Sequence, residues 1–331
     1  MTAADADTTS SKQKLVHAIC RRMPTYDPDN AKVKSSLGQR VMGRVLHELI
    51  TRDPSMTVVK RLNGAELEMP ANHSLISLLI GRPLYESELF RLLTFTAADR
   101  APLKIIDVGA NIGDTRARAP HGLAAEWLCI EAHPGFYALM EKNCRGMPDV
   151  CLEMSAVSDH DAAEPIRFHE RFGTASIAAD GGSGAVEVAA HTLDSILARH
   201  PKFADAAVFK TDTDGFEQRI FKGARGYLEH TKPRIYFECM SRHWRRTPPE
   251  NTPTEDLNIL SGFGYDSFLF YDENGYLFGV DAGGSRATVA ALEGYTDAKR
   301  YTYFNVVAFH RQEAEAAQRF LASERAFFAN R

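Results

Sequence analysis

Two acidic residues stand at the ends of short apolar runs and could bind one ligand together. Residues 103–108 are typical of a buried parallel strand, which carries Asp107 and runs into a turn of small residues. A second apolar run, residues 126–131, ends in Glu131, and in a βαβ unit an acid at this spacing typically binds a ribose. The pattern predicts a nucleoside ligand, contacted by Asp107, Gly109, Asn111, Gly113 and Glu131.

The turn does not fit a dinucleotide. The pattern GxGxxG brings a pyrophosphate to a helix N-terminus, whereas residues 109–113 have the spacing GxNxG. S-adenosylmethionine fits better, since it has no phosphate but carries an ammonium, a sulfonium and a ribose with two hydroxyls. Asp107 could accept from the ammonium directly or through water. The other interpretation is an ordinary α/β protein with a glycine-rich turn.

A third carboxylate follows the apolar run 207–211. Asp212 would stand at the end of the strand beside the first one, where a methyl group would be presented. Asp214 has a structural explanation, because with Glu217 it forms an Asp-x-x-Glu capping box for a helix that begins at Gly215. We therefore prefer Asp212 as the functional carboxylate.

Glu238 ends the next run and either faces the acceptor or pairs with Arg242. His243 follows on the same loop and could take a proton at neutral pH, or simply be solvated. The arginines of this loop could meet an anionic acceptor, or belong to an ordinary soluble loop: Arg242, Arg245 and Arg246.

Together these segments resemble the FkbM family of S-adenosylmethionine-dependent methyltransferases. The resemblance extends over residues 103–309, and order and spacing both agree with the family pattern. It rests on DVGANIG at 107–113, IEAHP at 130–134, AVSD at 156–159, KTDTDGFE at 210–217, KGA at 222–224 and YFE at 236–238. Two departures lie near the expected ligand: His133 replaces a frequent Asn, and Thr213-Asp214 replaces the common Val-Glu.

The resemblance implies a Rossmann-like methyltransferase that transfers a methyl group in line to a hydroxyl of a sugar, glycan or natural product. Its cofactor is expected to be S-adenosylmethionine, with no metal required. Asp212, Glu238 and His243 are the candidate catalytic residues. Asp212 is also a candidate cofactor contact, and Ala132, Ser158 and Asp159 complete the expected cofactor site, although Asp159 equally fits a turn.

The composition of the 331 residues is that of a soluble globular protein, with 44% hydrophobic and 25% charged residues. A net charge of −4 argues against general nucleic-acid binding, and no apolar run approaches the roughly 20 residues of a membrane span. The polar N-terminus is unlike a signal peptide, so we expect a cytoplasmic protein without membrane insertion. The five cysteines form no CxxC pair, which favours reduced thiols over disulfides or zinc.

Strands and helices alternate after residue 100, with a strand expected at 150–157 and a helix at 216–228 among them, which predicts an α/β fold. We expect a mostly parallel seven-stranded sheet with helices on both faces, over residues 101–331. Residues 1–14 are expected to be a disordered lead, and residues 15–100 a cap over the acceptor side. The cap would contain helices at 32–51 and 86–98 and a hairpin at 57–69, turning at Asn63-Gly64.

Two other classes of function stay open. One is an NAD-dependent oxidoreductase with a degenerate turn; the other is a non-catalytic module that binds a glycan or a partner protein on the same fold. The sequence does not identify the acceptor, and a homo-oligomer is compatible with it.

Overall fold

The structure is a computed structural model. It describes residue 18 and residues 57–162, 166–171, 174–177, 186–240, 252–283 and 286–331. The expected disordered lead at 1–14 and helix at 32–51 lie outside these residues.

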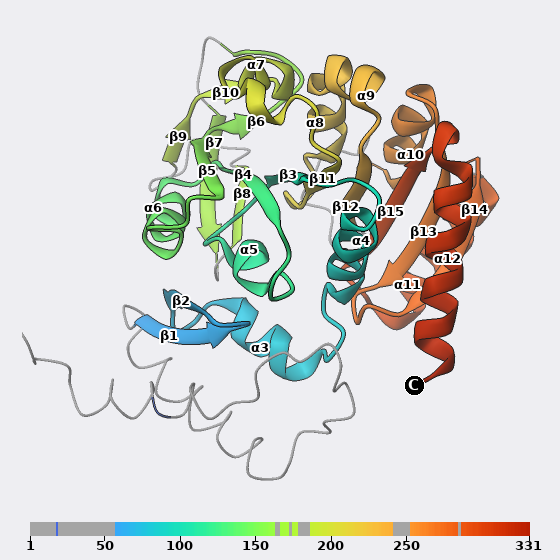
Figure 1. The fold of residues 1–331 in the computed structure, drawn as a ribbon, viewed down its shortest axis with the longest axis horizontal. Coiled ribbons are helices and arrows are strands. Elements are labelled where there is room, and N and C mark those ends of the chain that lie inside the picture. The colour runs from blue at the N-terminus through green and yellow to red at the C-terminus, as the bar shows by residue number, and fades with distance from the viewer. Residues whose placement is uncertain are drawn as a thin grey trace, which may run out of the picture.

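An eight-stranded sheet forms the centre of the fold (Figure 1). Its strand order is β14-β13-β15-β12-β11-β3-β4-β5. The bounds in chain order are β3 (Leu103–Val108), β4 (Ala125–Glu131), β5 (Val150–Met154), β11 (Val208–Thr211), β12 (Arg234–Met240), β13 (Tyr265–Asp272), β14 (Leu277–Ala282) and β15 (Tyr303–His310).

The expected sheet of seven strands is thus corrected to a mixed sheet of eight. Strands β5, β4, β3, β11 and β12 are parallel neighbours, whereas β15 runs antiparallel between β12 and β13. The additional strand β14 pairs antiparallel with β13 through a short turn in which Gly275 adopts φ 83°. A hairpin can add such an edge strand because it needs no crossover helix.

Helices cover both faces of this sheet, as the two hydrophobic clusters show. The first face carries α3 (Ser74–Gly81), α4 (Ser87–Ala97), α5 (Asp114–Arg118), α6 (Pro134–Asn143) and α12 (Ala314–Ala329). The second face carries α7 (Leu193–Arg199), α8 (Glu217–Gly223), α9 (Arg225–Thr231), α10 (Pro253–Gly262) and α11 (Arg286–Lys299). Short 3-10 turns, η1 (Pro201–Phe203) and η3 (Arg311–Glu313), complete the chain.

Two elements expected to be continuous are divided. The strand expected at 150–157 leaves the sheet after Met154, and β6 (Ala156–Val157) pairs instead with β10 (Ala190–His191). The helix expected at 216–228 is interrupted at Ala224 between α8 and α9. The insertion between β6 and β10 forms a three-stranded sheet of β7 (Ile166–Arg171), β8 (Thr174–Ile177) and β9 (Val186–Val188).

The expected N-terminal hairpin is present as β1 (Thr57–Leu62) and β2 (Ala65–Pro70), which form a sheet of their own. Asn63 and Gly64 both have positive φ, 45° and 90°, as the turn requires. The hairpin contacts α5 and α6, the two helices that follow β3 and β4.

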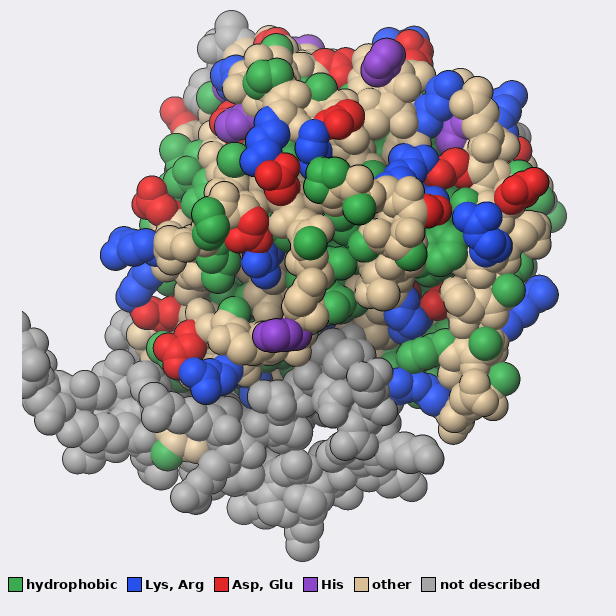
Figure 2. Space-filling view, in the orientation of Figure 1, with side chains coloured by type: hydrophobic (Ala, Val, Ile, Leu, Met, Phe, Trp, Pro, Cys, Tyr) green, Lys and Arg blue, Asp and Glu red, His purple; other side chains and the backbone are tan. Residues whose placement is uncertain are grey.

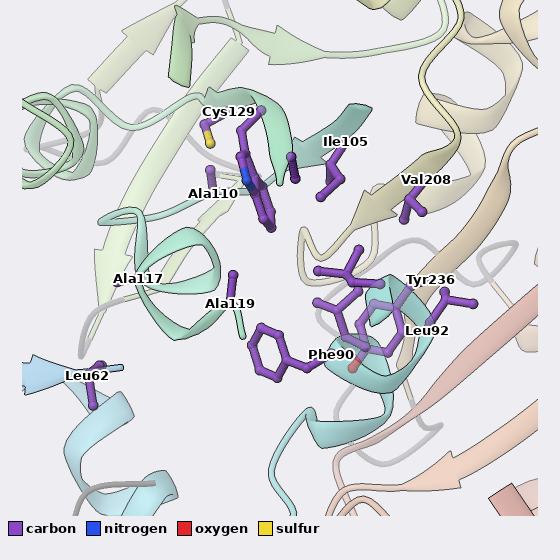
Figure 3. Close-up of a cluster of buried hydrophobic side chains, with 14 of the residues drawn as sticks. Leu62, Phe90, Leu92, Ile105, Ala110, Ala117, Ala119, Cys129, Val208 and Tyr236 are labelled. Carbon is purple, nitrogen blue, oxygen red and sulfur yellow. The ribbon is translucent and has the colours of Figure 1, made fainter. Parts of the chain in front are cut away.

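Helix α4 belongs to the main core. Its residues Leu89, Phe90, Leu92 and Leu93 are at most 4% exposed and share a cluster with strands β3, β11, β12 and β15. Figure 3 shows Phe90 and Leu92 beside Tyr236 of β12. The domain boundary expected at residue 100 stays a prediction, but the sheet and α4 are packed as one core.

On the face shown in Figure 2, basic and acidic side chains are interspersed over the surface. None of the described helices is long and apolar enough to cross a membrane. Cys129, Cys144, Cys151 and Cys239 are free thiols.

Candidate active site

The turn between β3 and α5, residues 109–113, lies at the carboxyl edge of the sheet. Gly109, Asn111 and Gly113 all have positive φ, 75°, 50° and 83°. A Cβ on Gly109 would lie 2.0 Å from the carbonyl oxygen of Asp212, so only glycine allows this approach of the β3 and β11 ends.

Asp107 is fully buried and forms an ion pair with Lys210, with 2.8 Å between Nζ and Oδ1. Its Oδ2 is also buried and accepts no hydrogen bond from the described residues. Burial lowers the pKa of Lys210, but the carboxylates of Asp107 and Asp212 outweigh this effect and raise it above the ordinary value. The lysine therefore remains a cation, and Asp107 keeps one oxygen for another donor.

Glu131 ends β4 and is only 6% exposed. Its Oε2 accepts from the backbone N–H of Asn111 at 2.8 Å, and its Oε1 accepts from that of His133 at 2.7 Å. Burial raises the pKa of this carboxyl to about 7. Each oxygen retains a lone pair, so the carboxylate can still accept from two hydroxyls of a ligand.

Asp212 follows β11, and its backbone N–H donates to Val108 of β3 at 3.1 Å. Its carboxylate is 28% exposed and lies 3.8 Å from Lys210 Nζ. Burial raises its pKa well above the ordinary value; Lys210 opposes this shift, whereas Glu86, Asp214 and Glu217 add to it. The exposed fraction shows that the group is within reach of a ligand.

Glu238 lies one strand further, on β12, and is 9% exposed. Burial raises its pKa well above the ordinary value, and the charge of Asp212 is the next contribution. The two carboxylates expected from the sequence therefore influence each other. The expected partner Arg242 and the candidate base His243 lie outside the described residues.

Residues that the sequence analysis did not select also act on Asp212. Arg82 donates to the hydroxyl of Tyr303 at 3.0 Å and pairs with Glu273 at 2.8 Å. Tyr85 and Glu86 precede α4, and their charges or dipoles act on Asp212 and Tyr303. No local pattern identifies these residues, because the long-range packing of α4 brings them here.

Glu86 is held by a buried arginine. Arg118 of α5 is 1% exposed, donates to Glu86 Oε2 at 2.5 Å and to the carbonyl of Tyr85 at 2.7 Å. Glu86 has φ 53° and is the N-cap of α4. The helix that follows the glycine turn therefore positions Glu86, whose charge raises the pKa of Asp212.

The capping box expected for Asp214 is wrong. Helix α8 begins at Glu217, its N-cap is Phe216, and no side chain caps it. Asp214 instead adopts φ 54°, and Glu217 Oε1 accepts from the backbone and hydroxyl of Thr213 at 2.9 and 2.7 Å. Glu217 stabilises the turn rather than the helix end, so the explanation by a helix cap no longer applies to Asp214.

Ser158 and Asp159 lie away from the end of β5. Met154 ends that strand opposite Glu131, and Ser155 donates from its backbone to the Glu131 carbonyl at 3.2 Å. Ser158 is buried against Gly223 of α8, and Asp159 accepts from Ser158 and His160 in a surface turn. Ala132 directly follows Glu131 and is partly buried. The roles of these three residues in cofactor binding stay predictions.

Among the residues that the structure describes, no group of three His, Cys, Asp or Glu side chains is arranged to hold a metal ion.

The model of the methyltransferase FkbM domain matches residues 107–276, more than half of the chain. The chain belongs to the FkbM methyltransferase family. Its cofactor is S-adenosylmethionine. The matched region begins at Asp107 and includes Glu131, Asp212 and Glu238 of this FkbM protein.

Solved structures of methyltransferases are similar to the chain at low identity. The FkbM methyltransferase of Methylobacillus flagellatus KT is 13% identical, with a TM-score of 0.38, over 82% of this chain and 60% of that chain. The match thus spans less than two thirds of the Methylobacillus protein.

Two further structures contain S-adenosylmethionine. Geranyl diphosphate methyltransferase is 9% identical, with a TM-score of 0.38, over 87% of this chain and 96% of that chain. Aeropyrum pernix fibrillarin is 12% identical, with a TM-score of 0.35, over 76% of this chain and 81% of that chain. No curated protein sequence matches the chain.

The residues at the turn of this FkbM protein fit the cofactor. The buried Oδ2 of Asp107 is an acceptor without a donor in the described structure, as a site for an ammonium group requires. Glu131 offers two acceptors at the neighbouring strand end, where a ribose would lie. The turn between them adopts positive φ at Gly109 and Gly113, where no side chain limits the approach of a ligand.

Proposed function

We propose that this protein is an O-methyltransferase that acts on a hydroxyl of a sugar, a glycan or a natural product. The observation that supports the proposal is the position of Asp212. Its carboxylate is partly exposed at the end of β11, beside the cofactor turn, and carries a raised pKa.

When bound, S-adenosylmethionine supplies an electrophilic methyl group on a positively charged sulfur. The acceptor oxygen must form its bond to carbon in line with the breaking carbon–sulfur bond, so the protein contributes mainly orientation and exclusion of water. The hydroxyl must also lose a proton. In our proposal Asp212 accepts this proton and later returns it to solvent.

The raised pKa suits Asp212 to this role. A carboxylate of ordinary pKa is a weak base for a hydroxyl, whereas burial and neighbouring carboxylates make the ionised form of Asp212 more basic. Lys210 limits the shift, because its charge favours the carboxylate over the acid. Glu238 and the hydroxyl of Tyr303 stand beyond Asp212 and could hold other hydroxyls of the acceptor.

The test uses labelled S-adenosylmethionine and an extract of the glycans and metabolites of the source cell. We expect transfer of label to an alkali-stable ether, with turnover reduced roughly 100-fold or more in Asp212→Asn. The matched control is Asp205→Asn, because Asp205 is exposed at the opposite end of β11 and pairs with Lys104. Turnover by Asp212→Asn equal to that of the parent would refute the assignment. If the parent transfers no label to any compound of the extract, the O-methylation is refuted.

Cofactor affinity separates a catalytic role of Asp212 from a binding role. Asp212→Asn should bind S-adenosylhomocysteine about as tightly as the parent, because the group is used mainly in the transition state. A parallel loss of affinity and turnover would instead assign Asp212 to the cofactor site.

A further inference from the structure

His73 lies between the N-terminal hairpin and α3, and it contacts the turn at residues 109–113, which we call the cofactor turn. Its Nε2 lies 3.1 Å from Oδ1 of Asn111, and the side chain is 6% exposed. Its Nδ1 accepts from the backbone N–H of Leu75 at 3.2 Å, which caps the start of α3. Because Nδ1 is an acceptor, a neutral His73 carries its proton on Nε2 and donates it to Asn111.

Asn111 needs support from its neighbours. Its φ of 50° lies in the left-handed region, which costs free energy for any residue with a side chain. The backbone N–H of Asn111 donates to Glu131 Oε2, the carboxylate that we assign to the ribose. His73 therefore fixes the side chain of the residue whose backbone orients Glu131.

Other contacts join the same segment to the turn. Asn143 donates to the carbonyls of Ile112 at 2.8 Å and Glu68 at 2.9 Å, and accepts from the backbone of Glu68. Asn63 donates to the carbonyl of Arg118 at 2.6 Å. The hairpin and the start of α3 thus contact both the cofactor turn and the helices that follow it.

We propose that His73 is a positioning residue for the cofactor: it holds Asn111 in the conformation that orients Glu131. The segment before β3 then contributes to the affinity for S-adenosylmethionine, in addition to any selection of the acceptor. His73 lies outside the region that matches the family model, which begins at Asp107.

Two substitutions separate the two hydrogen bonds of His73. In His73→Asn the amide oxygen can replace Nδ1 as the helix cap, but the side chain is too short to reach Asn111. In His73→Gln the amide nitrogen can replace Nε2 as the donor to Asn111, while the cap is weakened. If His73 acts in the cofactor site, His73→Gln should bind the cofactor more tightly than His73→Asn, whereas His73→Asn should be the more stable of the two.

The experiment measures S-adenosylhomocysteine binding by calorimetry and the melting temperature of the full chain. We expect His73→Asn to weaken binding about three- to ten-fold, as for the loss of one neutral hydrogen bond, with little change in melting temperature. His73→Gln should bind within about two-fold of the parent and melt at a lower temperature. His230→Asn is the matched control, because His230 is exposed on α9 at the other face of the sheet.

Binding by His73→Asn as tight as that of the parent would overturn the inference. A loss of affinity that follows the loss of stability in both variants would also overturn it, since His73 would then have only a structural role. No acceptor is present in this assay, so failure of the proposed O-methylation would leave its result unchanged.

Discussion

The carboxyl groups of the site differ in the charges and hydrogen-bond donors around them, and Glu131 shows this balance most clearly. Two backbone N–H groups favour its charged form, yet burial outweighs them and raises its pKa to about 7. Ribose hydroxyls donate more strongly to a carboxylate than to a carboxylic acid. Cofactor binding should therefore favour release of this proton.

We expect affinity for S-adenosylhomocysteine to increase between pH 6 and pH 8, through the pKa of about 7. Glu131→Gln should remove most of this pH dependence, and Glu131→Ala should weaken binding at pH 8 by roughly 1–3 kcal/mol. Calorimetry in two buffers of different ionisation enthalpy would detect the released proton. Unchanged affinity in Glu131→Ala would show that the ribose is bound elsewhere.

Gly109 provides a second prediction at this scale. An alanine there would place its Cβ 2.0 Å from the Asp212 carbonyl, and the residue would also have to keep φ 75°. We expect Gly109→Ala to lower stability by about 2 kcal/mol or more, and to reduce turnover further by displacing Asp212. The control is Gly64→Ala, which has a positive φ but no atom within 4 Å of a Cβ. Equal effects of the two substitutions would show that close contact with Asp212 is unimportant.

The site could be predicted in part from single residues. Asp107, Glu131, Asp212 and Glu238 lie at or near the carboxyl ends of strands, although β12 continues past Glu238 to Met240, and an acid late in an apolar run is visible in sequence. Arg82, Tyr85 and Tyr303 could not be found in this way, because they reach the site through packing between distant segments. Asp214 shows a further limit: its capping pattern is present, but the chain forms a different turn.

At the scale of elements, Arg118 joins α5 to the start of α4. Its removal would leave Glu86 buried without its cation, and the carbonyl of Tyr85 without a donor. We expect Arg118→Ala to reduce the free energy of unfolding by about 3–5 kcal/mol. Arg116→Ala, which removes a more exposed pair with Asp149, should cost about 1 kcal/mol or less. Denaturant titration of both variants tests the difference, and similar losses would contradict it.

The contact of α4 with the sheet includes a buried acid. Glu88 accepts from the hydroxyl of Tyr236 at 3.1 Å and from Asn305 at 2.8 Å. Burial raises its pKa to about 7 against an ordinary value of 4.5, although Arg91 opposes the shift. The native state thus prefers the protonated acid. The contribution of Glu88 to the free energy of unfolding is therefore complete below pH 4.5 and is lost as the pH rises through about 7.

Between pH 5 and pH 8 we expect the free energy of unfolding to decrease less in Glu88→Gln than in the parent. The two decreases should differ by up to about 3 kcal/mol. A neutral glutamine can accept the same two hydrogen bonds without having to ionise. Glu66→Gln is the control, because that side chain is 65% exposed. Parallel pH profiles for the parent and Glu88→Gln would show that Glu88 does not titrate in this range.

For the whole molecule, alternation of strands and helices was sufficient to predict an α/β sheet with covered faces. It could not give the order β12-β15-β13, because antiparallel insertion of the last strand depends on pairing across the molecule. The sequence analysis also placed α4 in a cap, whereas this helix packs in the core of the sheet. The periodicity of α4 shows an apolar face, but not which surface covers that face.

A truncated chain that begins at residue 101 should therefore be unstable. It lacks the four buried apolar side chains of α4, worth about 6–12 kcal/mol together, which is comparable with the stability of a typical domain. A chain that begins at residue 57 keeps this core and should bind S-adenosylhomocysteine. Soluble expression and calorimetry compare the two, and a folded, cofactor-binding chain from residue 101 would show that α4 is dispensable.

The contacts of α4 also have a consequence for synthesis on the ribosome. Glu88 bonds to Asn305, 217 residues later, and Arg91 pairs with Glu324, 233 residues later. When α4 emerges, the strand and helix that will cover it have not yet been translated, so its leucines and phenylalanine stay accessible to chaperones. Folding of α4 then depends on residues translated much later, and a premature stop before β15 would leave Glu88 without Asn305 and Arg91 without Glu324.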